Sequence, residues 1–92
     1  MKIINLKFDT EITALASYSY GQQVFNEQVK DLDYNEKYKI VFPERIELIS
    51  TSFVQGFFYE FQTVFGLEGI LNNVEVISSI PNIKNYCLDC MY

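Results

Sequence analysis

The arrangement of apolar and polar residues predicts a succession of strands and helices along the whole chain. Apolar residues that alternate with polar ones, or short apolar runs between turn residues, indicate strands. Apolar residues three and four positions apart indicate helices. The predicted elements are a strand at 2–8, a short apolar segment at 12–16 that is a second strand or the approach to a helix, a helix at 19–32, strands at 38–42 and 46–49, a helix at 52–65, a strand at 74–77 and a last short helix after residue 82.

The helix at 52–65 has the clearest pattern. Apolar residues recur at helical spacing from Phe53 to Phe65. Ser52 and Gln55 fit a capping box at its start, and Gly66 is a natural C-terminal stop.

The earlier helix also begins at a serine. Ser19 and Gln22 fit the same capping pattern, and Ser17 is a competing cap. Strands that alternate with helices predict an α/β fold with a mixed or parallel sheet, and an α+β arrangement is the alternative. The length of 92 residues predicts a single domain over 1–92.

Composition argues against an enzyme. The chain has no histidine, which removes the commonest general base and the commonest metal ligand. Its four glycines do not form a phosphate loop, and no nucleophile–base pair is visible. Cys87 and Cys90 form a C-x-x-C pair, but a zinc site needs four ligands, so we interpret them as two reduced cytosolic thiols. We therefore predict no catalytic residues, no metal and no cofactor.

Charge and hydropathy bear on location and partners. The net charge of −5 makes the chain a poor direct ligand for nucleic acid, because phosphate contacts need Lys and Arg. No apolar run approaches the roughly 18 residues that cross a membrane, and the start of the chain lacks a signal peptide. These features predict a cytoplasmic protein without a membrane partner.

A cluster of hydroxyl residues is the best candidate for a working surface. The apolar run at 46–49 ends at Ser50, Thr51 and Ser52, directly before the clearest helix. One hydroxyl is enough for an N-cap, which contributes about 1 kcal/mol, so three exceed that need. The alternatives are a helix cap with spare hydroxyls, or a phosphoacceptor at the positive end of a helix.

The helix that follows offers apolar contact area. Most of its phenylalanines are expected in the core, but Phe53 and Phe57, near its start, are the ones expected to be exposed. Together with Gln55 and the hydroxyl cluster they form the predicted partner-binding surface, and a homodimer through this face is an open alternative.

Two segments resemble the STAS-like domains, a group related to the anti-sigma factor antagonists. Residues 16–24, Ala-Ser-Tyr-Ser-Tyr-Gly-Gln-Gln-Val, are similar to the Ser-Arg-x-x-Gly/Ala opening of the family's first helix. Residues 46–53, Ile-Glu-Leu-Ile-Ser-Thr-Ser-Phe, are similar to its strand-to-helix segment. The resemblance extends over residues 10–80. The chain departs from the pattern at Tyr18, where the family has arginine, and at Phe42-Pro43, where it has Asp-Phe.

The resemblance implies a mixed four- or five-stranded sheet with two main helices packed on one side. It also implies a regulatory hydroxyl before the second long helix, which a partner kinase phosphorylates in the antagonist relatives. Thr51 matches that acceptor by position, with Ser50 in place of the preceding aspartate. The implied partner is a protein, for example a GHKL-type ATPase.

These observations predict a non-catalytic regulatory module that docks a protein partner through residues 49–58. The alternative is a small acidic inhibitor, such as a phage-encoded blocker of a host defence or nucleic-acid enzyme. Small size and acidity favour that alternative, which expects clustered carboxylates facing a basic groove. A bacterial or phage origin fits both.

Overall fold

A three-stranded parallel sheet forms the centre of the fold. The computed structural model describes residues 1–91, so Tyr92, the last residue of the predicted domain, lies outside the described part. The sheet consists, in spatial order, of β1 (Lys2–Asn5), β3 (Tyr38–Val41) and β5 (Val74–Ile77). Lys2 lies opposite Tyr38, and Tyr38 opposite Val74, so the three strands are in step.

A separate two-stranded sheet lies beyond the ends of β1 and β3. It pairs β2 (Ala14–Leu15) with β4 (Leu48–Ile49), again in parallel. Nη2 of Arg45 donates to the main-chain carbonyl oxygens of Phe8 and Asp9, which holds the segment before β4 against the segment before β2. The predicted α/β class is confirmed. Of the two predicted alternatives, a mixed or a parallel sheet, the structure has the parallel one, since every strand pair in residues 1–91 is parallel. The single mixed sheet of four or five strands that the resemblance implied is wrong, because the strands are divided between two sheets.

The division arises from turns after the two long strands. Pro43 has no N–H and cannot continue the ladder of β3. Its carbonyl accepts from the N–H of Ile46 at 3.1 Å, which closes a turn. A similar turn after β1 is closed by the N–H of Ile12, which donates to the carbonyl of Asp9 at 3.0 Å. Both segments therefore leave the first sheet and resume pairing as β2 and β4.

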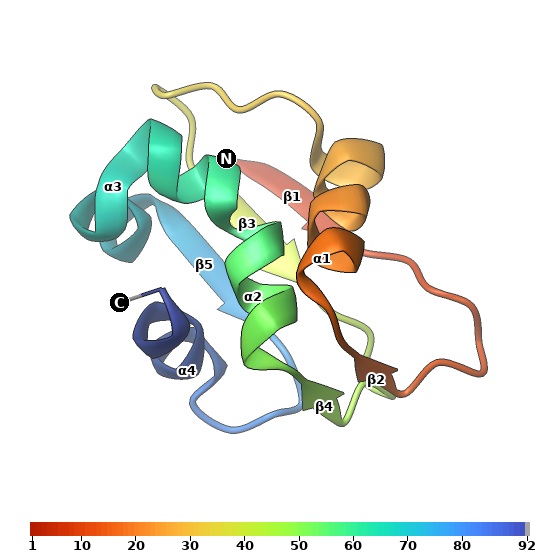
Figure 1. Ribbon diagram of the computed structural model, residues 1–92. Helices are drawn as coiled ribbons and strands as arrows, with labels where there is room; N and C mark the ends of the chain where they lie inside the picture. Colours follow the sequence, from red (N-terminus) through yellow and green to blue (C-terminus); the bar gives the residue numbers. More distant parts are fainter. Residues whose placement is uncertain (92) are drawn as a thin grey trace.

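Each short strand leads directly into a helix. β2 is followed by α1 (Tyr18–Val24), which continues as the π-helical segment η1 (Phe25–Val29), and β4 is followed by α2 (Thr51–Phe57). The chain thus repeats the order of long strand, short strand and helix. Figure 1 shows α1 and α2 side by side in front of the central sheet.

Serines at the ends of the short strands cap both helices. Ser17 Oγ accepts from the N–H of Tyr20 at 3.1 Å, and Ser50 Oγ accepts from the N–H of Phe53 at 3.1 Å. At the first helix the cap is therefore Ser17, the competing candidate, and not Ser19. The cap predicted at Ser52 is wrong by two residues. The first hydroxyl after each strand already reaches a free N–H of the first turn, so the later serine lies inside the helix.

The predicted helix at 52–65 is two helices in the structure. α2 ends before Phe58, whose φ of −90° and ψ of 4° are not helical, and α3 (Tyr59–Asn73) follows. Gly66 has a φ of 71° and interrupts α3, but the helix resumes beyond this predicted stop. The last helix is α4 (Ile83–Cys90). None of the helices in residues 1–91 has the length and apolar character needed to cross a membrane.

The core lies between the central sheet and the helices, and aromatic rings fill much of it. Phe53 and Phe57 stack with their ring centroids 6.0 Å apart, and Phe57 meets Phe61 at 5.8 Å. Tyr38 of the central strand contacts Phe61 edge-on at 5.9 Å. These four side chains are at most 1% exposed, and burying each is worth roughly 1.5–3 kcal/mol.

Two glycines set the distance between α1 and α2. A Cβ atom placed on Gly21 would lie 2.7 Å from the main-chain nitrogen of Phe57, and one on Gly56 would lie 2.9 Å from the carbonyl carbon of Tyr18. Real Cβ atoms do not approach other atoms so closely. The two helices therefore pack backbone to backbone at this point, which places the start of α2 firmly over the sheet.

Candidate functional site at the start of α2

The three predicted hydroxyls lie together, but they have different roles. Ser50 is half-buried, and its hydroxyl is occupied by the helix cap. Ser52 is exposed, and its Oγ lies 3.1 Å from Oγ of Ser50. Thr51 is exposed in the first turn of α2. Thr51 and Ser52 are therefore accessible to a kinase or a partner, whereas Ser50 is primarily structural.

A small apolar pocket includes the two residues of β4, directly before these hydroxyls in the sequence. Its volume is about 200 Å³, and it is lined by Glu47, Leu48, Ile49, Ile80, Pro81 and Tyr86. Leu48 is 62% exposed although it belongs to a strand. Pockets for small-molecule ligands usually exceed about 300 Å³, so this one suits a single side chain better than a metabolite.

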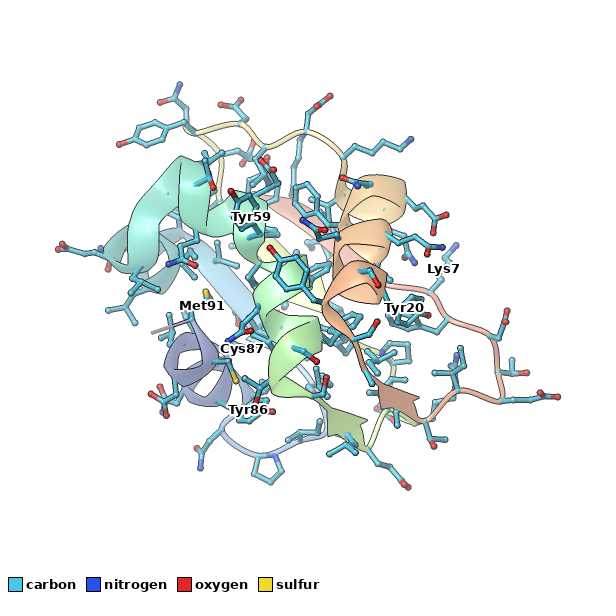
Figure 2. The ribbon with its side chains drawn as sticks, in the orientation of Figure 1. Lys7, Tyr20, Tyr59, Tyr86, Cys87 and Met91 are labelled. Carbon is cyan, nitrogen blue, oxygen red and sulfur yellow. The ribbon has the colours of Figure 1, made fainter. Side chains whose placement is uncertain are left out.

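The C-terminal helix completes this surface. Tyr86 of α4 donates from Oη to the carbonyl oxygen of Ile49 at 2.7 Å, which holds α4 against the end of β4 (Figure 2). Gln55 donates from Nε2 to the carbonyl oxygen of Cys90 at 3.1 Å. The amide of Gln55, predicted to bind a partner, thus already ties α2 to the end of α4, although its side chain is exposed.

The predicted exposure of Phe53 and Phe57 is wrong. Both side chains are 0% exposed, and each takes part in the aromatic core. The close approach of α1 through Gly21 and Gly56 covers the face of α2 that the sequence left open. A partner at this site would contact Leu48 and the hydroxyl residues, because the two rings are out of reach without unfolding.

The two cysteines are packed side chains. Cys87 is 1% and Cys90 8% exposed, and both are free thiols on the inner face of α4. Burial, with a smaller effect of Cys90, raises the pKa of the Cys87 thiol to about 12. The thiolate is the reactive form, so Cys87 is inert near neutral pH. Within residues 1–91, no three His, Cys, Asp or Glu side chains are grouped so that they could hold a metal ion.

Tyr20 is a second titratable group with a shifted pKa. Its ring lies between Phe8, at 6.4 Å, and Phe53, at 5.7 Å. Burial raises the pKa of the phenol, and the negative charges of Asp9 and Glu27 raise it further. The phenol therefore stays neutral at physiological pH and serves as packing on the flank of α1.

Sequence reasoning missed the pocket. Ile80, Pro81 and Tyr86 lie more than thirty residues after Leu48, and no local pattern connects them to it. The exposure of Leu48 could have been predicted from the strand pattern. The next strand residue, Ile49, is buried, and alternation in a strand then places Leu48 on the outer face.

The pocket has one charged residue on its wall, Glu47. The sequence has no basic residue between Arg45 and Lys84. Comparison with protein-family models, curated proteins and solved structures finds no match for this chain. The interpretation of the site therefore depends on its own chemistry: an exposed leucine, an apolar pocket with one carboxylate on its wall, and two accessible hydroxyls nearby in the sequence.

Proposed function

We propose that this chain is a non-catalytic regulatory module that docks a protein partner at the junction of β4 and α2. One observation carries the proposal: Leu48 is 62% exposed on the wall of an apolar pocket, and the exposed Thr51 and Ser52 follow two and three residues after the end of its strand in the chain. Full burial of a leucine is worth roughly 1.5–3 kcal/mol, so a partner that covers it gains a substantial part of a binding energy. The resemblance to STAS-like domains supports the same segment.

Phosphorylation of Thr51 is the regulatory step that we propose. A phosphate carries about −1.5 to −2 charges, and in the first turn it would face the free N–H groups of the helix. It would also add negative charge next to Glu47 and the pocket. Phosphorylation would therefore leave the fold intact. It would weaken the binding of a partner whose contact surface is apolar or acidic.

The resemblance suggests a GHKL-type ATPase as the first partner to test, in the cytoplasm. The test immobilises the wild type and variants of exposed residues and incubates each with this partner, or with proteins from the source cells. The amount of partner that each retains is measured by quantitative mass spectrometry. Leu48→Asp should abolish retention of a specific partner. Leu71→Asp is the matched control, because Leu71 is 53% exposed on a different surface.

The phosphorylation step has its own pair of variants. Thr51→Glu should weaken retention, and Thr63→Glu, at an exposed position of α3, should not. Circular dichroism must show that all four variants are folded. Equal retention by wild type, Leu48→Asp and Thr51→Glu would refute docking at this surface. Partner retention that is lost at high salt and is the same for wild type and Leu48→Asp would favour the acidic inhibitor instead.

A further inference from the structure

The central sheet has one face without helices. In β3 and β5 the residues Tyr38, Ile40, Val74 and Val76 are buried beneath the helices, and the residues between them point to the opposite face. Figure 1 shows α1 and α2 in front of the sheet, with most of α3 and α4 to the side of β5. The helix-free face is formed by Ile3 and Asn5 of β1, Lys39 and Val41 of β3, and Glu75 and Ile77 of β5.

An open face is unusual for this type of sheet. Sheets made only of parallel strands occur almost always with both faces covered. Here Ile3 is 59% and Ile77 39% exposed, and Val41 between them is half-buried. The apolar side chains on this face indicate a surface that another molecule covers.

Two rows of residues run across the helix-free face. One row contains Ile3, Lys39 and Glu75, which lie opposite one another on the three strands. The next row contains Asn5, Val41 and Ile77. On β3 and β5, therefore, a row with one cation and one anion lies next to a row of two apolar side chains. The charges balance, so the face is complementary to a copy of itself.

We propose that a second copy of this chain covers the helix-free face in a two-fold symmetric dimer. The symmetry axis runs parallel to the strands, midway between β3 and β5. A rotation about this axis lays β3 of one copy over β5 of the other and keeps the rows in step. Lys39 then meets Glu75 of the second copy, and Val41 meets Ile77 of the second copy, each twice by symmetry.

Charge selects this position of the axis. An axis along β3 would place Lys39 against Lys39 of the second copy. An axis between β1 and β3 would place Ile3 against Lys39 and Asn5 against Val41. Only the axis between β3 and β5 pairs opposite charges and apolar side chains at the same time, and it leaves Ile3 at the rim.

The dimer is expected to be weak. A stable interface buries about 800 Å² on each partner. The overlap of β3 with β5 covers four side chains on each copy, which is less than that, and two of the four are charged. We therefore expect a dissociation constant on the order of 100 μM, which permits exchange with a monomer.

Sedimentation velocity between about 10 μM and about 1 mM tests the dimer. The wild type should shift from monomer to dimer over this range. Lys39→Glu and Glu75→Lys should each weaken self-association at least about 10-fold, because each creates two like-charge contacts. The double variant Lys39→Glu/Glu75→Lys should restore it. An equimolar mixture of the two single variants should form heterodimers, in which both opposite-charge pairs return.

The mixture is the decisive experiment. A homodimer of either single variant brings only like charges together at positions 39 and 75, whereas the heterodimer pairs opposite charges at both contacts. Lys39→Gln, which creates no repulsion, should have an intermediate effect and replaces Lys39→Glu if the latter fails to fold. Glu68→Lys, on the exposed side of α3, is a control with the same charge change and should dimerise. A wild type that stays monomeric at about 1 mM, or single variants whose mixture stays monomeric, would overturn the proposal.

Discussion

Substitution of Gly56 by alanine tests the close packing of α1 against α2. Ordinarily Gly→Ala inside a helix stabilises a protein by roughly 0.5–1 kcal/mol. Here the new Cβ would lie 2.9 Å from the carbonyl carbon of Tyr18 and 3.1 Å from its Cα, and closer still to its oxygen. These are main-chain atoms, so no side-chain rotation relieves the clash. α1 and α2 must move apart over a core that holds Phe53 and Phe57 at 0% exposure.

The expected net effect follows from these opposing terms. Overpacking of a tight core costs about 1–3 kcal/mol, and a clash with the main chain belongs at the upper end. After subtraction of about 1 kcal/mol for helix propensity, we expect Gly56→Ala to lower the free energy of unfolding by about 2 kcal/mol. In a domain of this size that lowers Tm by about 8–16 °C.

Urea unfolding and calorimetry measure this change. Gln62→Ala, at an exposed position of α3, is the control and should change the stability by less than about 0.5 kcal/mol. Gly21→Ala should act like Gly56→Ala, and the double variant should cost less than the sum, since one separation of the helices relieves both clashes. An unchanged or raised stability of Gly56→Ala would refute the close contact of the two helices.

Two further predictions concern α4. The pKa of Cys87 is about 12 against an ordinary value of 9.0. The folded state therefore keeps a proton that the unfolded state loses, so stability should fall as pH rises from about 9 to 12, by roughly 1 kcal/mol at pH 10. Cys87→Ala should abolish this part of the pH dependence in urea unfolding, and a retained slope would contradict the assignment. Tyr86→Phe removes the bond to the Ile49 carbonyl and should cost about 1 kcal/mol; Tyr59→Phe, at a 49% exposed tyrosine, is its control.

Local patterns predicted the kinds of element well. The strand predicted at 74–77 is β5, from Val74 to Ile77, because Val74 and Val76 alternate with residues on the other face. Gly66 was predicted to end a helix; its φ of 71° interrupts α3, which then continues to Asn73. These features depend on neighbours within a few residues, which a sequence displays directly.

Boundaries and caps depended on competition between neighbouring residues. Ser17 and Ser19, and likewise Ser50 and Ser52, are all good caps by residue type. Ser17 and Ser50 are the first hydroxyl residues after the last pair of β2 and β4, Leu15 with Ile49, and they are the ones that cap. The position of each cap therefore coincides with the end of a contact between strands far apart in the sequence.

The sequence by itself determined an α/β chain whose most distinctive segment is a strand end, a hydroxyl cluster and an aromatic helix start. Only the tertiary structure decided which of those residues a partner can reach. Contact between Gly21 and Gly56 closed the core over Phe53 and Phe57, and α4 brought Tyr86 to the exposed Leu48. A local pattern shows which side chains share one face of a helix or strand. Whether that face is buried depends on which distant element packs against it, and the local pattern does not show that.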